Sequence, residues 1–190
     1  MTLNFPLVKV RLRDGNTTGD DVIQVFTGNG RGKTTAALGS VLRALGQGLN
    51  VYIAHFMKGT HVYGEQKALA QLPNVTIEQF GTAGFVDPRN VKEEDKAEAQ
   101  RAFNSARDAI TGGKYDLVVM DEANVAVAWG LIAVDDLVNL AKERPENVEI
   151  IITGRYADPR LMTVADLVTE MVEVKHPYQQ GIKAREGFEY

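Results

Sequence analysis

The sequence alternates between short apolar runs and segments in which apolar residues recur every three or four positions. A short apolar run is typical of a buried strand, whereas the wider spacing is typical of a helix with one buried face. Six apolar runs predict strands at residues 22–26, 50–56, 75–80, 115–122, 148–154 and 167–176. The last is expected to be half exposed, because its apolar and polar residues alternate. Helices are predicted in between, at residues 33–48, 64–72, 90–111 and 134–143, and from residue 159 onwards.

The helix boundaries follow from capping and breaking residues. Gly46 or Gly48 ends the first helix, and the glycine pair at 112–113 ends the long one. Asn90, with Glu93 three residues later, is expected to cap the start of the long helix. Two sets of residues at helical spacing are expected to face the core: Ala37, Val41, Leu42 and Leu45 in the first helix, and Ala99, Phe103, Ala106 and Ile110 in the long one.

Strands that alternate with helices require crossover connections, which give a parallel sheet covered by helices on both faces. We therefore expect an α/β fold with three α/β/α layers around a mainly parallel, six-stranded sheet. Residues 20–190 suffice for one domain with a core, and residues 1–19, which end in a polar run, are expected to form a flexible arm. Ligands of such sheets bind at the carboxyl ends of the strands, so the residues that follow each strand are the candidates for function.

The loop after the first predicted strand, TGNGRGKT at residues 27–34, differs from the phosphate-binding pattern G-x-x-x-x-G-K-[ST] only in having Thr27 at the first glycine. Glycines let successive N–H groups point at phosphates, and the following helix adds its positive end. Lys33 would supply charge to the phosphates and Thr34 an oxygen to Mg²⁺ or Mn²⁺. The alternative, a glycine-rich turn without a ligand, is disfavoured by the strand–loop–helix context. The candidate nucleotide-binding residues are Gly28, Asn29, Gly30, Arg31, Gly32, Lys33, Thr34 and Thr35.

Two further strand ends carry candidate residues. Asp121 and Glu122 follow the most apolar strand, where a phosphate site is expected to have an acidic residue that holds Mg²⁺ directly or through water. A polar strand end at the surface is the alternative, and Glu122 could be a metal ligand or, in a hydrolase, the base that polarises water. Arg155 follows the fifth strand and could bind phosphate or a second substrate. It could equally form a surface ion pair with Asp158 or Asp166.

The composition narrows the range of functions. The sequence has no cysteine, which excludes disulfides, thiolate metal sites and thiol nucleophiles. The formal charge of −4 and the lack of a basic stripe give no sign of a nucleic-acid surface. No apolar run approaches the roughly 18 residues of a membrane span, and the amino terminus lacks the apolar core of a signal peptide. We therefore expect a cytoplasmic protein that binds neither nucleic acid nor membrane.

Three more stretches accompany the glycine-rich loop and the acidic pair, in order: FMKGTHVYGE at residues 56–65, TAGF at 82–85, and the run from residue 153 to 190. Together they resemble the P-loop ATP:corrinoid adenosyltransferases, also called cob(I)yrinic acid a,c-diamide adenosyltransferases, over residues 22–190. The loop and the acidic pair are shared by very many ATPases, whereas ADLVTEM, KHP and GIKA in the last run are far more specific. Thr27 is similar to the family's own loop, whose first position need not be glycine. The resemblance implies a P-loop NTPase fold of the RecA-like kind.

The resemblance also implies a reaction. A corrinoid (cobalamin, cobinamide or cobyrinic acid diamide) reduced to cobalt(I) attacks the 5′ carbon of ATP, and triphosphate leaves, in the biosynthesis or salvage of adenosylcobalamin. The protein would align cobalt with the ribose carbon and neutralise the leaving group, with ATP reversed in the loop. Lys33, Glu122 and Phe85 are implied as catalytic residues, and Thr34, Asp121 and Glu122 as metal ligands. The implied partners are a flavoprotein reductant and a second copy of the chain in a homodimer, with the arm folded over the active site.

Two positions depart from the family pattern. His61 stands where the family often has Trp, and a lone loop histidine is more often solvated than a cobalt ligand. Phe85 matches an aromatic residue near the lower face of the corrinoid, but Asp87 replaces a Trp two residues further on. Such aromatic residues help to strip the lower axial ligand from cobalt, so Asp87 leaves open which corrinoid is used and how it is reduced.

Two other functions stay open on the sequence alone. A RecA-like ATPase would use Glu122 to activate water and would release ADP and phosphate, although the chain is short and has nothing that resembles the partner surface of a motor. A corrinoid or nucleotide carrier would bind its ligand without turnover. Analysis of the products distinguishes these functions from adenosyl transfer.

Overall fold

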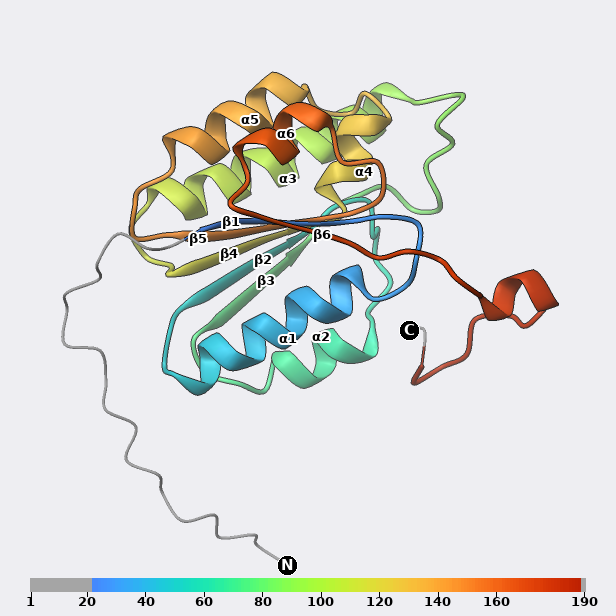
Figure 1. Ribbon diagram of the computed structural model, residues 1–190, viewed down its shortest axis with the longest axis horizontal. Coiled ribbons are helices and arrows are strands. Elements are labelled where there is room, and N and C mark those ends of the chain that lie inside the picture. Colours follow the sequence, from blue (N-terminus) through green and yellow to red (C-terminus); the bar gives the residue numbers. More distant parts are fainter. Residues whose placement is uncertain (1–21, 189–190) are drawn as a thin grey trace, which may run out of the picture.

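The computed structural model describes residues 22–188, which form a six-stranded sheet with helices on both faces (Figure 1). The strands are β1 (Ile23–Thr27), β2 (Val51–His55), β3 (Val75–Gln79), β4 (Leu117–Asp121), β5 (Glu149–Thr153) and β6 (Leu167–Glu170). They lie in the order β3-β2-β4-β5-β1-β6, and all neighbouring pairs are parallel. The predicted six-stranded parallel sheet is therefore confirmed.

The helices form the two outer layers of the predicted α/β/α arrangement. On one face of the sheet lie α1 (Lys33–Gly46) and α2 (Gly64–Leu69) (Figure 1). The other face is covered by α3 (Glu93–Thr111), α4 (Ala123–Ala128), α5 (Val134–Glu143) and α6 (Pro159–Val164). A 3₁₀-helix, Pro177–Gln180, follows β6 and projects beyond the sheet.

The sheet separates two apolar cores. Phe103 of α3 packs with Leu137 of α5 on one face, and Ala37 and Val41 of α1 pack on the other. Every residue of β4 is buried between these layers, which explains why its sequence is almost entirely apolar. The rigid, doubly covered centre of the sheet therefore fixes the ends of β4 and its neighbours, where the candidate residues lie.

The core residues predicted for the long helix are confirmed, because all four are buried: Ala99, Phe103, Ala106 and Ile110. The prediction for the first helix is wrong at Leu42, which is exposed, whereas Leu38 is buried. The buried face of α1 therefore includes Leu38 together with Ala37 and Val41, and Leu42 lies outside it.

The start of α3 also differs from the prediction. The helix begins at Glu93 with Lys92 as its N-cap residue, so Asn90 is not the cap. The Asp95 carboxylate accepts a hydrogen bond from the Lys92 backbone N–H at 3.1 Å, while the Asn90 N–H donates to the Asp87 carbonyl in the preceding turn. Asp95 thus reaches back and satisfies the first turn, which leaves Asn90 outside the helix.

The last strand is shorter than predicted and is exposed throughout. β6 ends at Glu170, and all four of its residues are exposed, so the expectation of alternating burial over residues 167–176 is wrong. β6 lies at the edge of the sheet with β1 as its neighbour. Beyond Glu170 the backbone turns to the glycine-rich loop, where the Met171 N–H donates to the Thr27 carbonyl at 2.8 Å. That hydrogen bond continues the pairing with β1, and the Gly30 N–H donates to the Met171 carbonyl at 2.6 Å, which brings the following segment to the candidate site.

The predicted arm, residues 1–19, lies outside the described residues. Within residues 22–188, no helix is both long enough and apolar enough to cross a membrane.

Candidate active site

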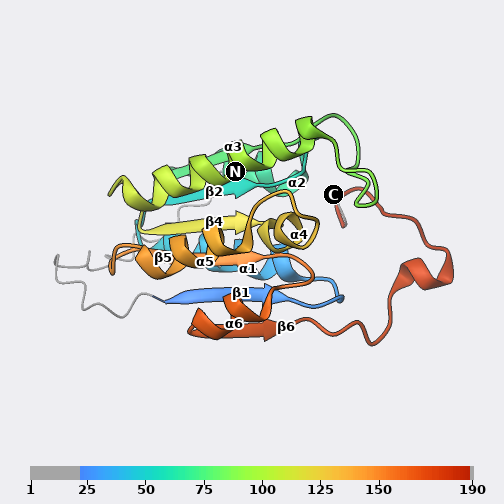
Figure 2. The same cartoon turned by 90° about the horizontal axis from the view of Figure 1, so that it is seen from above.

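The loops that follow β1, β4 and β5 all leave the same edge of the sheet, the edge at which the strand arrows end (Figure 2). β5 lies between β1 and β4, so the glycine-rich loop and the acidic pair are separated by one strand. The sequence places Thr153, Gly154 and Arg155 directly at the end of that intervening strand. Parallel pairing therefore brings the three predicted strand ends to one place.

The glycine-rich loop has the backbone form that a phosphate-binding loop requires. Gly28 and Gly32 have positive φ angles of 93° and 118°, which residues with a side chain rarely adopt. Gly32 is also the N-cap of α1, and the helix start has neither a side-chain cap nor an acidic residue in its first turn. The N–H groups of that turn point out of the helix end and are available to an anion.

Lys33 lies folded across the loop. Its Nζ donates hydrogen bonds to the carbonyls of Gly28 at 2.8 Å and Gly30 at 2.7 Å. Burial lowers the pKa of Lys33, and the charge of Glu122 partly offsets that effect. The structure thus holds an ammonium group inside the curve of the loop, beside the open N–H groups of α1.

Asp121 is the centre of a buried hydrogen-bond network. It is 0% exposed. Its Oδ1 accepts hydrogen bonds from the hydroxyl groups of Thr34 and Thr153, both at 2.7 Å, and its Oδ2 lies 2.9 Å from Nδ1 of His55. Because a carboxylate can only accept, the hydrogen in the last contact belongs to His55 Nδ1. Thr34 and Asp121, which were predicted as parts of one metal site, are therefore in direct contact.

The two neighbouring carboxylates differ in their tendency to ionise. Burial raises the pKa of Asp121, but the hydrogen bond from His55 and the charge of Lys58 outweigh it and hold the pKa at about 2. Burial and the charge of Asp121 raise the pKa of Glu122, although Lys58 and Lys33 act against that shift. Asp121 is therefore the permanent anion of the site, whereas Glu122 depends on nearby cations for its charge.

The donor set fits Mg²⁺ or Mn²⁺ bound together with phosphate. The Thr34 hydroxyl gives its hydrogen to Asp121, which leaves its lone pairs free for a cation. All the candidate donors are oxygens, which Mg²⁺ prefers. No group of three or more His, Asp or Glu side chains within residues 22–188 is arranged to hold a metal alone. Magnesium in nucleotide sites takes much of its coordination from phosphate and water, so a sparse protein contribution suits it.

Arg155 lies against the glycine-rich loop. Its guanidinium group donates to the carbonyl of Asn29 at 3.4 Å. Of the two proposed ion-pair partners, Asp158 binds Arg160 instead, and Asp166 accepts from the Ile23 N–H. Arg155 is therefore placed beside the loop rather than in the predicted surface ion pairs.

The residues predicted for the corrinoid side lie apart from this network. Phe85 is fully exposed in the loop between β3 and α3, which projects beyond the carboxyl edge of the sheet. Asp87 is exposed, and its carboxylate accepts from the Arg89 N–H at 3.0 Å. His61 is exposed too and lies edge-on to the Tyr63 ring, with 4.7 Å between the centroids. The structure therefore does not bring Phe85, Asp87 or His61 into the network around Asp121.

The fold adds residues to the site that were not predicted from the sequence. His55 and Thr153 bind Asp121, and Lys58 acts on it by charge. A signal was present, because each of the apolar runs of β2, β4 and β5 ends with a polar residue. These ends lie on neighbouring strands, with His55 directly paired with Asp121. A polar residue at the end of a buried parallel strand marks this edge of the sheet.

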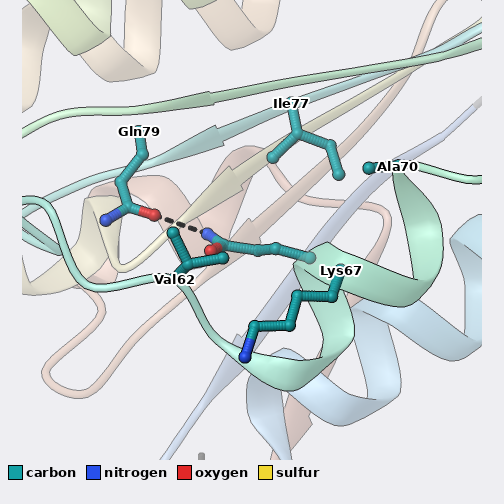
Figure 3. A pocket seen from close by; sticks show the side chains of 6 residues that line it. Val62, Lys67, Ala70, Ile77 and Gln79 are labelled. Carbon is teal, nitrogen blue, oxygen red and sulfur yellow. Dashed lines mark hydrogen bonds between the residues drawn. The ribbon is translucent and has the colours of Figure 1, made fainter.

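A hollow of about 400 Å³ lies nearby, between α2 and β3 (Figure 3). It is lined by Val62, Gln66, Lys67, Ala70, Ile77 and Gln79, and none of these belongs to the glycine-rich loop or the acidic pair. Gln79 connects the hollow to the candidate site. The side-chain amide of Gln79 donates to the carbonyls of Lys58, Gly59 and His61. Gln79 thereby fixes the loop that carries Lys58.

The parallel sheet, its two helical layers and the glycine-rich loop before α1 define a protein of the three-layer α/β P-loop NTPase-like class. A solved structure described as the cytoplasmic domain of EssC has the same fold, with a TM-score of 0.51 and 16% identity, over 87% of this chain and 34% of that one. At this identity the likeness shows the fold alone.

The family is shown by sequence. Residues 19–190 match the ATP:corrinoid adenosyltransferase BtuR/CobO/CobP family, and the chain belongs to that family. It is 36% identical to the corrinoid adenosyltransferase of Escherichia coli strain K12, over 89% of this chain and 85% of that protein. It is equally 36% identical to the corrinoid adenosyltransferase of Pseudomonas aeruginosa, over 89% and 83% of the two chains.

Family membership confirms the predicted enzyme class, a transferase that moves the adenosyl group of ATP to a corrinoid in cobalamin metabolism. The hydrolytic alternative is not favoured, because the matching family and these two relatives are described as corrinoid adenosyltransferases.

Proposed function

We propose that this chain joins the cobalt(I) of a reduced corrinoid to the 5′ carbon of ATP at the edge of the sheet described above. A cobalt–carbon bond forms, the bond between the 5′ carbon and its phosphate oxygen breaks, and the electron pair leaves with triphosphate. Because cobalt(I) is the nucleophile, the protein needs none. Its tasks are alignment of the two substrates and stabilisation of the leaving group.

The observation that carries this proposal is the direct contact of Thr34 with Asp121 beside the Lys33 ammonium group. The glycine-rich loop and the start of α1 offer N–H groups to the triphosphate, and Lys33 offers a positive charge. Arg155, beside Asn29, can reach the same phosphates. These residues bind the part of ATP on which negative charge develops.

Thr34, Asp121 and Glu122 are the residues that would hold Mg²⁺ or Mn²⁺. When bound, the ion supplies positive charge to the triphosphate and so favours its departure. Thr34 contributes its hydroxyl oxygen, Asp121 orients that hydroxyl, and Glu122 gains its ionised form near a cation.

We propose the corrinoid side of the site from the resemblance to the family. Phe85 is fully exposed and would cover the lower face of the corrinoid, with Asp87 two residues further on. We propose that residues 20–190 act as one cytoplasmic domain, that a flavoprotein supplies the electrons, and that two copies form a homodimer. Residues 1–19 would cover the corrinoid, so deleting them should weaken corrinoid binding more than ATP binding. Equal affinities after deletion would contradict that role.

The test mixes ATP, Mg²⁺ and a chemically reduced corrinoid with the full chain. We expect an adenosylated, light-sensitive corrinoid, detected by its spectrum, together with inorganic triphosphate. ADP and phosphate in place of triphosphate would contradict the proposal and support hydrolysis. Binding of both substrates without any product would indicate a carrier.

A further inference from the structure

A buried histidine beside the acidic pair has no part in the reaction as described so far. His55 is the last residue of β2 and is 1% exposed. Its Nδ1 lies 2.9 Å from Asp121 Oδ2, but its Nε2 is buried without a hydrogen-bond partner among the described residues. A buried polar atom without a partner lowers stability. An apolar residue would fill this strand end at no such cost, so the histidine needs an explanation within the site.

The backbone holds His55 firmly in place. β2 lies between β3 and β4, and His55 is paired in register with Gln79 on one side and Asp121 on the other. The His55 carbonyl accepts from the Phe80 N–H at 2.9 Å, and the Phe56 N–H donates to the Asp121 carbonyl at 2.9 Å. Residues paired in register on parallel strands present their side chains to the same face. The imidazole is thus fixed beside the carboxylate from a rigid element.

His55 completes the orientation of the Asp121 carboxylate. Oδ1 accepts the hydroxyl hydrogens of Thr34 and Thr153, and Oδ2 accepts from His55. With donors on both oxygens, the carboxylate cannot rotate without breaking hydrogen bonds. Without His55, Oδ2 would lack this donor, and Lys58, whose charge acts on Asp121, would compete for the carboxylate.

We infer that His55 is a positioning residue for the metal site: its Nδ1–H holds Asp121 so that the Thr34 hydroxyl presents its lone pairs to a cation bound to the triphosphate. This inference rests on the proposed function. Side chains that hydrogen-bond to a metal ligand without contacting the metal commonly change the affinity for the metal.

The test uses substitutions of the full chain that separate the two ring nitrogens. His55→Phe keeps a buried ring and removes both nitrogens. His55→Asn places a side-chain N–H near the position of Nδ1, whereas the longer side chain of His55→Gln places one near the position of Nε2. Tyr52→Phe is the matched control, because Tyr52 is a buried residue of the same strand whose hydroxyl bonds to Glu78 and Ser105, away from Asp121.

The measurement is the affinity for Mn²⁺ in the presence of ATP, followed by electron paramagnetic resonance without corrinoid, and the affinity for ATP in EDTA. We expect His55→Phe to weaken Mn²⁺ binding about 10- to 100-fold, which is the usual effect of losing such a partner. ATP binding in EDTA should stay unchanged. His55→Asn should bind Mn²⁺ within a few-fold of the wild type, His55→Gln should resemble His55→Phe, and Tyr52→Phe should bind normally.

Wild-type Mn²⁺ affinity in folded His55→Phe would overturn the inference. If His55→Phe does not fold, equal losses in His55→Asn and His55→Gln would overturn it instead, and selective rescue by His55→Asn would support it. If the variants show the expected pattern of Mn²⁺ affinities but the wild-type chain forms no adenosylated corrinoid, the role of His55 is supported and the proposed function is contradicted.

Discussion

Lys33 and Glu122 are two ionisable residues of the candidate site whose pKa values are shifted by burial. Lys33 is satisfied by two loop carbonyls, and its pKa is lowered by burial, so the ammonium group is partly desolvated. Glu122 lies in a left-handed backbone conformation with φ of 65°, and its pKa is raised. A bound triphosphate would bring negative charge to Lys33, and a bound cation would bring positive charge to Glu122. Each opposite charge stabilises the ionised form of its neighbour.

The first prediction at this scale concerns Lys33. Lys33→Ala should lower kcat/KM for adenosyl transfer by about 100-fold or more, the usual effect of losing one preorganised electrostatic group. Lys142→Ala, which removes an exposed lysine of α5, is the control and should be neutral. Steady-state rates with ATP as the varied substrate measure the effect. Near-normal turnover of Lys33→Ala would contradict the assignment of this loop.

The second prediction concerns Glu122. Glu122→Gln keeps the shape of the side chain and removes its charge, so it should raise the Mg²⁺ concentration needed for half-maximal activity, by about tenfold. A magnesium titration of adenosyl transfer measures this, with Glu143→Gln on the exposed side of α5 as the control. A hydrolytic base would behave differently: the variant would bind MgATP normally and lose only ATP cleavage. A tightly trapped MgATP complex would therefore count against our assignment.

Sequence alone identified only part of the network around Asp121. Thr34 and Asp121 could be found because each stands at a recognisable position after a strand. His55 could be marked only as a polar residue at a strand end. Its contact with Asp121 depends on two facts that the sequence does not carry: the strand order, which makes β2 the neighbour of β4, and the register, which pairs His55 with Asp121. Thr153 was visible as part of a strand end, but its hydrogen bond to Asp121 required the same two facts.

At the scale of elements, the glycine-rich loop is coupled to the segment after β6. The Gly30 N–H donates to the Met171 carbonyl at 2.6 Å, so that segment uses an N–H group of the loop. A Cβ on Gly30 would lie 2.7 Å from the Met171 carbonyl oxygen and 2.8 Å from the backbone of Val172. Glycine is needed here because another backbone approaches closely.

The third prediction follows from this packing. Gly30→Ala should destabilise the protein by about 1–3 kcal/mol, as overpacking does, and should weaken ATP binding because the loop must move. Gly39→Ala is the matched control, because Gly39 is exposed in α1 and its new Cβ would meet no atom within 4 Å. The free energy of unfolding of Gly39→Ala should rise by about 0.5–1 kcal/mol, because alanine favours a helix more than glycine does. Urea denaturation and ATP titration measure both variants, and equal stability of the two would contradict a close contact.

The predictions of elements succeeded where local chemistry decides and failed where tertiary contacts decide. The helix at Val134–Glu143 was predicted with its observed bounds, because its amphipathic pattern stops before Pro145. α4 was missed, since its sequence ANVAVA continues the apolar character of the preceding strand. The end of β6 was misplaced because it depends on the contact of Met171 with the glycine-rich loop.

At the scale of the whole molecule, we propose that the carboxyl edge of the sheet binds both substrates. The proposed triphosphate site is polar, and both Asp121 and Lys33 in it are buried. The segments that project beyond the same edge carry exposed apolar side chains, including Phe85 before α3 and Val174 and Tyr178 after β6. A corrinoid is large and has a broad apolar face, so exposed apolar groups beside a nucleotide site suit it.

The fourth prediction concerns the corrinoid that this edge accepts. Phe85 is fully exposed, so Phe85→Ala should change stability by less than about 0.5 kcal/mol. If the ring packs against the lower face of the corrinoid, its loss should raise KM for the corrinoid by about 10- to 100-fold, the value of burying one phenylalanine. The increase should be largest for corrinoids with a tethered lower base, because cobalt must shed that base before it is reduced.

Asp87 cannot displace the base by packing, so the wild type should prefer a base-free cobyrinic acid or cobinamide form. Asp87→Trp should narrow that preference, and initial rates with both corrinoid types measure it. Equal wild-type rates for both types, together with an unchanged Phe85→Ala, would show that this loop does not form the lower face of the site.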